Sequence, residues 1–114
     1  MVLLVFKNVL DTKTEKVDLG KEANFSIKDV LTPKDSFGAF SAGIFEGSGK
    51  FDLDYTFDEI ALILEGKLEL TDRETKQTKV LQKGDMFHIT KGSKITFKSS
   101  GYKEFYICHP PFFG

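Results

Sequence analysis

The segment Phe51–Asp58 is the part of this chain that most constrains its fold. Apolar residues alternate there with polar ones, in the order Phe51, Asp52, Leu53, Asp54, Tyr55, Thr56, Phe57, Asp58. This period of two is that of a β-strand with one buried face and one solvent-facing face. A register shift of one residue would bury aspartates, which is costly unless a cation pairs with them. We therefore expect Leu53 and Tyr55 to point into the core.

The rest of the chain also predicts short strands and no long helix. Glycine and proline separate runs rich in Phe, Val, Ile and Tyr, and no long stretch has a helical period. The expected strands are Val2–Phe6, Ala39–Phe45, Lys50–Phe57, Ile60–Leu70, Thr78–Leu81, Met86–Thr90, Lys94–Phe97 and Lys103–His109. The segment Ile27–Phe37, which contains Pro33, is expected to connect early strands, and the polar segment Asp72–Lys79 to form a hairpin with its tip in water. The 114 residues predict a single all-β domain spanning residues 1–114.

Composition excludes several classes of partner. The net charge of −1 and the mixed acidic and basic residues give no basic surface for nucleic acid. The apolar opening run Met1–Phe6 is far shorter than the ~20 residues of a membrane span, so no membrane contact is expected. Cys108 is the one cysteine, so no internal disulfide can form, and its position in a β-like run predicts a buried thiol. A cytoplasmic protein is expected.

The spacing of several residues resembles the two sequence motifs of the cupin family: Gly47, Glu59 and Gly66, then Gly84, Gly92 and Ile95. The family pattern, Gly-x5-His-x-His-x3-Glu-x6-Gly followed by Gly-x5-Pro-x-Gly-x2-His, places a metal inside a small jelly-roll barrel. Here Leu53, Tyr55 and Ile95 stand at the histidine positions, and only Glu59 matches a ligand. The resemblance implies a cupin jelly-roll β-barrel, also called a double-stranded β-helix. Because Leu and Ile offer no lone pairs, we expect no metal at the usual place and no other cofactor.

Further stretches resemble one branch of cupins, the cupin domain of ethanolamine utilisation protein Q (EutQ-like): Tyr55–Ile60, Lys83–Asp85, Lys91–Phe97, Phe105–Ile107 and Asp29–Thr32. This resemblance implies a bacterial dimer of ethanolamine catabolism, in the cytoplasm or associated with a bacterial microcompartment, and a family linked to acetate kinase activity. A phosphate-binding glycine loop is absent from the sequence, so a kinase activity rests on the resemblance alone.

Glu59 is the first candidate for a functional residue, with Tyr55 close to it. If Glu59 points into the interior, desolvation favours its neutral form, and it could act as a general acid. The alternative is a structural carboxylate that is hydrogen-bonded to Tyr55 or to a backbone amide. If the strand Met86–Thr90 keeps its alternation, His88 shares the inward face with Thr90 and completes an acid–base pair. The expected catalytic residues are Glu59, Tyr55 and His88, and those expected to contact a ligand are Leu53, Ile95, Phe97 and Tyr106.

The chain has twelve phenylalanines and no tryptophan, more large aromatic side chains than one small barrel easily buries. We expect some of them at the contact of an isologous homodimer, with the N-terminal strand added to the partner's sheet. The candidates for this contact are Val2–Phe6, Phe40, Phe45, Phe112 and Phe113.

Three functions remain open. The leading hypothesis is an EutQ-like cupin that binds or weakly transforms a small molecule in its barrel. The second is a non-catalytic recruiting module that acts through its dimer surface, and the third is a metal-dependent enzyme whose unusual ligands are His88, Glu59 and Tyr55. An open, polar pocket around Glu59 would favour the first hypothesis. An interior filled by Phe51, Phe87 and Phe97 would favour the second.

Overall fold

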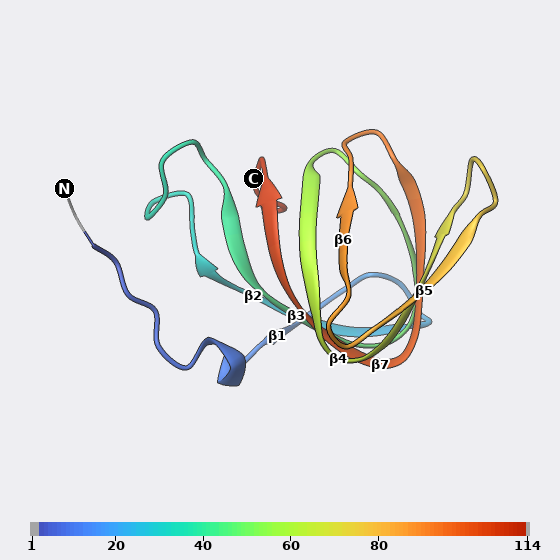
Figure 1. The fold of residues 1–114 in the computed structure, drawn as a ribbon, viewed down its shortest axis with the longest axis horizontal. Coiled ribbons are helices and arrows are strands. Elements are labelled where there is room, and N and C mark those ends of the chain that lie inside the picture. Colours follow the sequence, from blue (N-terminus) through green and yellow to red (C-terminus); the bar gives the residue numbers. More distant parts are fainter. Residues whose placement is uncertain (1–2, 114) are drawn as a thin grey trace.

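The computed structural model describes residues 3–113, which are built almost entirely of antiparallel strands (Figure 1). The strands are β1 (Glu15–Val17), β2 (Ala23–Leu31), β3 (Ser41–Asp54), β4 (Asp58–Asp72), β5 (Thr78–Gln82), β6 (Met86–Ile89) and β7 (Lys94–His109), preceded by a short 3₁₀ turn, η1 (Val9–Asp11). In this part of the chain no helix is long and apolar enough to cross a membrane. The all-β prediction is confirmed.

Three long strands, β3, β7 and β4, form the frame of the molecule. The sheet order is β1-β2-β3-β7-β4-β5, and β6 pairs with β4 as well. Along one edge β4 binds first β6, through Glu59–Leu62, and then β5, through Lys67–Thr71. Irregular pairing in β3 and at two points in β4 bends the long strands, so that they curl around a shared interior (Figure 1). Because β1 and β5 lie at opposite ends of this order, the barrel is not strictly closed.

Two glycines of the first motif lie where neighbouring strands approach very closely. A Cβ on Gly47 would lie 2.2 Å from the Asn24 carbonyl oxygen, and one on Gly66 would lie 2.1 Å from the Gly101 carbonyl oxygen. Both residues also have positive φ, 148° at Gly47 and 79° at Gly66. Only glycine satisfies both conditions without strain, so the motif spacing reflects the geometry of the barrel.

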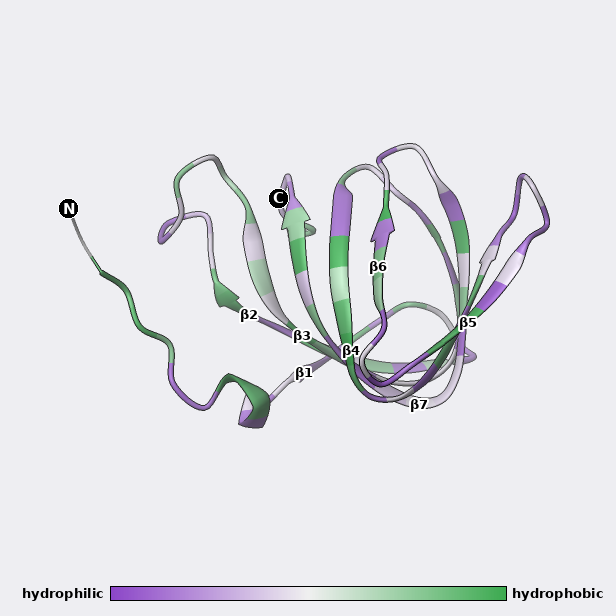
Figure 2. Cartoon of the chain, in the orientation of Figure 1, coloured by the Kyte–Doolittle hydropathy of each residue, from purple (hydrophilic) through white to green (hydrophobic). Residues whose placement is uncertain are grey.

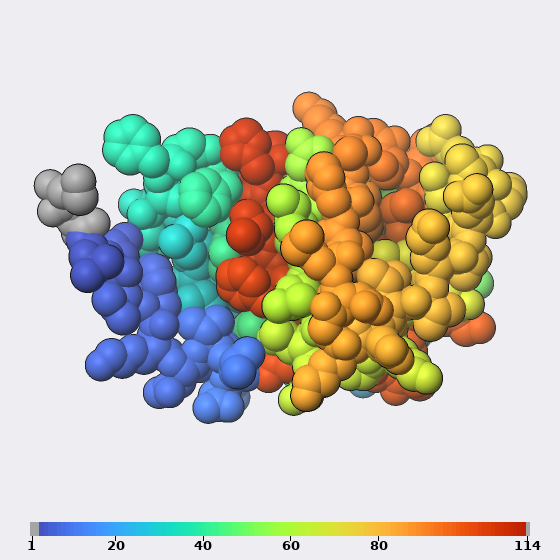
Figure 3. Space-filling view, in the orientation of Figure 1, coloured from blue at the N-terminus to red at the C-terminus, as the bar shows by residue number. Residues whose placement is uncertain are grey.

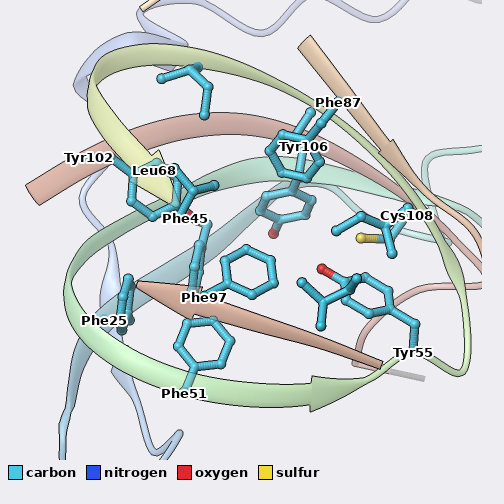
Figure 4. Close-up of a cluster of buried hydrophobic side chains, with 14 of the residues drawn as sticks. Phe25, Phe45, Phe51, Tyr55, Leu68, Phe87, Phe97, Tyr102, Tyr106 and Cys108 are labelled. Carbon is cyan, nitrogen blue, oxygen red and sulfur yellow. The ribbon is translucent and has the colours of Figure 1, made fainter. Parts of the chain in front are cut away.

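Aromatic side chains fill much of the barrel interior (Figure 4). Phe25 stacks on Phe45 with ring centroids 5.1 Å apart, and Phe51 stacks on Phe97 at 4.7 Å. Hydrophobic and hydrophilic residues alternate along the strands in Figure 2.

The register predicted for the segment Phe51–Asp58 is confirmed. Tyr55 is buried and Leu53 is half-buried, whereas Asp52 and Asp54 are exposed. The strand therefore turns its apolar residues toward the interior, as the alternation requires.

The structure differs from the sequence-based strands at the N-terminal end. Residues 3–6 form no strand and extend away from the barrel (Figure 1), and Val2 lies outside the described residues. In contrast, β2 covers the start of the segment Ile27–Phe37 that was expected to be a connection. The reason is that Phe25 and Ile27 alternate toward the interior before Pro33 is reached.

Elsewhere, pairs of expected strands are continuous in the structure. The runs expected at Ala39–Phe45 and Lys50–Phe57 belong largely to β3, and those at Lys94–Phe97 and Lys103–His109 both belong to β7. Glycine-containing irregularities bend these strands without ending them. The hairpin expected around Asp72–Lys79 is confirmed: β4 and β5 pair on either side of it, and residues 74–79 are exposed.

Candidate functional site

A half-open pocket lies inside the barrel, with a volume of about 40 Å³. Its walls are apolar and aromatic, and its polar groups come from a few side chains on β4, β7 and the turn after β3. The lining residues are Val17, Leu19, Ile27, Phe45, Phe51, Leu53, Tyr55, Phe57, Glu59, Phe97, Glu104, Tyr106, Cys108 and Phe112. This combination of apolar walls and few polar groups is typical of small-molecule sites.

Glu59 lies on the inner face of β4 and is 7% exposed. Tyr55 donates a hydrogen bond from its hydroxyl to Glu59 Oε1 at 2.6 Å. The backbone of Tyr55 is fixed in turn, because its N–H donates to the Ser93 carbonyl at 2.8 Å and its carbonyl accepts from the Gly92 N–H at 2.8 Å. The second motif therefore positions Tyr55, and Tyr55 orients the carboxyl group of Glu59.

Glu104 is a second buried carboxyl group, which sequence reasoning missed. It lies on β7, has no exposed surface, and accepts a hydrogen bond from the Tyr102 hydroxyl to Oε1 at 2.5 Å. Within residues 3–113, its other oxygen, Oε2, has no hydrogen-bond partner apart from the neighbouring Glu59 carboxyl group. The sequence did carry a signal for the burial of Glu104. Tyr102, Glu104, Tyr106 and Cys108 are spaced two residues apart and so share one face of a strand, and Cys108 was already expected to be buried.

Burial raises the pKa of both carboxyl groups. For Glu104 the nearby charge of Glu59 raises the pKa further, so that it lies well above the usual range. For Glu59 the effect of burial is partly offset by hydrogen bonds from the protonated Glu104 carboxyl and from the Tyr55 hydroxyl, both of which lower its pKa. The ion pairs among the described residues involve Lys28 and Arg73, and none reaches this pair. One carboxyl group can therefore hold a proton while the other accepts one.

The remaining polar groups near the pocket are held in their neutral forms. Burial raises the pKa of Tyr55 and Tyr102 well above the ordinary value, so both hydroxyl groups remain donors. Burial also raises the pKa of the Cys108 thiol, and the expectation that Cys108 is buried is confirmed. Figure 4 shows the Tyr55 hydroxyl and the Cys108 sulfur pointing toward the interior.

Tyr106 reaches across to β2, where its hydroxyl donates a hydrogen bond to Asp29 Oδ1. Gly43 makes room for this contact, since a Cβ at that position would lie 2.7 Å from the Tyr106 hydroxyl oxygen and 2.0 Å from the Lys28 carbonyl oxygen. This contact links β2 to β7 beside the pocket.

The structure brings most of the predicted site residues together. Tyr55, Glu59, Leu53, Phe97 and Tyr106 all line the pocket. Ile95 is buried opposite Leu53, but it is not part of the lining.

The prediction that His88 faces inward was wrong. His88 is exposed on the outer face of β6, opposite Ile60. The inner positions of β6 belong to Phe87 and Ile89, which are both buried. Large apolar side chains gain more from burial than an imidazole does, and this sets the register of the strand. An acid–base pair of His88 with Glu59 does not form.

The metal that the cupin pattern implies does not fit these residues. Leu53 and Ile95 carry no lone pairs, and the hydroxyl of Tyr55 is already bound to Glu59. In the described part of the chain, no three His, Cys, Asp or Glu side chains lie close enough together to hold a metal ion. The ligand set His88, Glu59 and Tyr55 is also not assembled, because His88 lies on the opposite face of the sheet.

Comparisons with known proteins agree with the sequence motifs. The sequence profile of the family "Ethanolamine utilisation protein EutQ" matches residues 2–112. The fold is similar to EutQ of Clostridium difficile, with a TM-score of 0.82 and 23% identity over 92% of this chain and 79% of that one. It is also similar to an ethanolamine utilisation protein Q of Salmonella typhimurium LT2, with a TM-score of 0.75 and 25% identity over 83% and 76% of the two chains.

A more distant structural neighbour is the ectoine synthase of P. lautus, with a TM-score of 0.71 and 20% identity over 98% of this chain and 80% of that one. A search of curated protein sequences finds no match. These neighbours confirm the cupin jelly-roll fold.

Proposed function

Because this chain belongs to the family of ethanolamine utilisation protein EutQ, we propose that it binds a small molecule in its barrel and transfers protons to and from it through Glu59 and Glu104. The family and the fold support a cupin-type function. The observation that carries the more specific proposal is the pair of buried carboxyl groups in a half-open pocket, one of which keeps an unpartnered oxygen.

Each residue of the pair has a distinct part in this proposal. Glu104 holds its proton, because burial and the neighbouring Glu59 both raise its pKa, and it serves as the acid. Glu59 accepts a proton and serves as the base, with Tyr55 orienting its carboxyl group. Tyr102 orients Glu104 in the same way. Carboxyl groups with different environments divide acid and base roles in this manner.

The surrounding pocket restricts what can react. Phe51 and Phe97 stack on each other within its lining and exclude water from one side. Phe51, Phe87 and Phe97 are all buried, as the recruiting hypothesis expects, but they leave a pocket of about 40 Å³ beside Glu59, and this remaining space supports the binding hypothesis.

The family name extends the proposal to metabolism. We place the reaction in ethanolamine or acetate metabolism, with the protein in the cytoplasm or associated with a bacterial microcompartment. This part is supported by family membership alone. A fluorescent fusion expressed in a bacterium that makes ethanolamine microcompartments would test it, and a distribution unaffected by induction of the compartments would contradict the association.

A binding screen tests the proposed pocket. Cationic, neutral and anionic fragments of a few heavy atoms are added to isotope-labelled protein, and backbone amide shifts are recorded. We expect the shifts to cluster at Leu53, Phe97 and Tyr106. They should weaken by at least about tenfold in Glu59→Gln, which keeps the shape of the side chain but removes the base.

Glu65→Gln is the matched control, because Glu65 lies on the same strand but is exposed. It should bind fragments as the unmodified protein does. Fragment shifts that cluster away from the pocket, or that are equally strong in Glu59→Gln, would refute the proposal.

A second candidate function, a recruiting module, is favoured by an apolar outer surface. Ile60, Leu62, Met86 and Ile107 are each at least 38% exposed and lie on adjacent strands β6, β4 and β7. Figure 3 shows these strands side by side on one face of the molecule. The apolar N-terminal arm, Leu3–Phe6, is exposed as well. We propose that the arm and the outer face of two copies cover each other in a homodimer.

The phenylalanines expected at this contact need correction. Phe45 is buried in the core, and Phe112 packs edge-on against Phe57 with centroids 5.4 Å apart.

Leu62→Lys should shift the mass in light scattering from dimer to monomer. Val80→Lys, at an exposed apolar position on β5, should leave the dimer intact. A monomeric unmodified protein at micromolar concentration would contradict this proposal.

A further inference from the structure

The acidic end of the pocket lacks a cationic partner. Glu59 and Glu104 both line it, and no Lys, Arg or His of the described residues forms an ion pair with either. Apart from the contact between the two carboxyl groups, the buried Glu104 Oε2 has no hydrogen-bond partner within residues 3–113. A buried acidic pair of this kind is stabilised by a cation or by a proton. The titratable groups around the pair are Tyr55, Tyr102, Tyr106, Cys108 and, beyond Tyr106, Asp29, and none of these is a cation.

Aromatic rings form the rest of the enclosure. Tyr55 lies against Phe57 with centroids 4.8 Å apart, and Phe57 contacts Phe112 near the end of the chain. All three residues line the pocket. The faces of aromatic rings attract cations and repel anions, so these walls favour a cationic ligand, as the carboxyl groups do.

The size of the pocket limits the ligand. A volume of about 40 Å³ is well below the ~150 Å³ of a cavity that holds benzene. It accommodates a head group of a few heavy atoms, and the half-exposed lining residues Val17, Leu19 and Leu53 lie where the pocket meets solvent. Building on the proposed function, we propose that the pocket binds the primary ammonium group of a small amine at the Glu59–Glu104 pair, where it replaces the hydrogen bond that joins the two carboxyl groups.

This assignment follows from matching donors to acceptors. An ammonium group offers three donors and no acceptor, and the oxygens of the two carboxyl groups provide acceptors, including Glu104 Oε2, which has no partner other than Glu59. A carboxylate ligand would instead place a third acidic group beside the pair. An alcohol could form hydrogen bonds but could not balance charge. When the ammonium group binds, the proton held by the pair leaves to solvent, so one positive charge replaces another and the net charge of the site is unchanged.

The test compares three probes of nearly equal size and different charge: ethylammonium, ethanol and acetate. Binding is followed at neutral pH by amide shifts of pocket residues and by calorimetry in two buffers that differ in their enthalpy of ionisation. We expect ethylammonium to bind at least about tenfold more tightly than ethanol, acetate to show no binding, and calorimetry to detect proton release. Affinity for ethylammonium should rise with pH while the amine stays protonated.

Glu104→Gln and Glu59→Gln should each reduce ethylammonium affinity at least about tenfold, and Glu65→Gln should leave it unchanged. Since a buried substitution could disturb folding, the shift spectrum of each variant is compared with that of the unmodified protein. Ethanol or acetate binding as tightly as ethylammonium in the pocket would overturn the ammonium assignment and leave the proposed function standing. If no probe shifts the pocket residues, the ammonium assignment is also overturned, and the proposed function is decided by the wider fragment screen.

Discussion

Replacing Glu104 by Gln should change how the stability of the protein depends on pH. The side chain is fully buried, and its pKa is raised in the folded state by burial and by Glu59. In the unfolded chain the carboxyl group titrates near its ordinary value, so the folded state binds more protons above that pH. The free energy of unfolding must therefore fall as pH rises from the unfolded pKa toward the folded one.

The expected size follows from the proton linkage. One carboxyl group that stays protonated only in the folded state lowers the free energy of unfolding by about 1.4 kcal/mol per pH unit, or at most about 3.5 kcal/mol between about pH 5 and 7.5. Because Glu104 has no exposed surface, solvent screening does not reduce this effect much. For a small domain with a total stability of about 5–15 kcal/mol, the change is easily measured.

Urea unfolding followed by circular dichroism at several pH values in this range measures the slope. The unmodified protein should lose stability with rising pH, and Glu104→Gln should lose much less, because its amide cannot titrate and can donate to Glu59. Stopping at about pH 7.5 avoids ionisation of Cys108 in the unfolded state. Glu65→Gln should follow the unmodified protein. A flat or rising stability of the unmodified protein, or the same slope in Glu104→Gln, would refute the assignment of a raised pKa to Glu104.

Three further predictions concern other residues. Cys108 should react with a thiol reagent only after unfolding, because burial raises its pKa; rapid reaction of the native protein would contradict this. His88→Ala should leave fragment shifts in the pocket unchanged, since His88 lies on the outer face, and a large loss of binding would show that it reaches the pocket. Gly43→Ala should lower stability by about 3 kcal/mol in urea unfolding, because its Cβ would overlap the Lys28 carbonyl oxygen. An unchanged midpoint would show that β2 and β3 are not packed so closely.

The inward and outward faces of the central strands could be predicted from the sequence because burial has a simple period there. Residues Phe51 to Phe57 alternate without interruption, and their burial follows the alternation. The ends of strands were harder to predict. β2 begins in a polar region and contains a bulge between Asp29 and Leu31, and its pairing with β3 depends on residues far away in the sequence. Residues 3–6 have the composition of a strand but no pairing partner within the described part of the chain.

The candidate site was only half predictable for a related reason. Glu59 and Tyr55 could be identified because motif spacing and alternation agree on them. Glu104 belongs to no motif, and a glutamate on a strand is usually solvent-exposed. His88 was misplaced because β6 is short, and its alternation alone does not show which face is inward. The burial of Phe87 and Ile89 decides the orientation.

The absence of the metal-ligating histidines and the presence of Glu104 both concern how the buried charge of Glu59 is compensated. A carboxylate in an apolar barrel needs compensation, and in a metal-binding cupin a cation provides it. Here Leu53 and Ile95 cannot hold a metal, so Glu59 must obtain compensation from a donor. Tyr55 supplies one hydrogen bond, and a hydrogen bond from the protonated Glu104 carboxyl also lowers the pKa of Glu59. A second glutamate is tolerated in this position only if it keeps its proton or shares a cation. The pair therefore behaves as a site that exchanges a proton for a positively charged ligand, so binding of the ligand should release one proton.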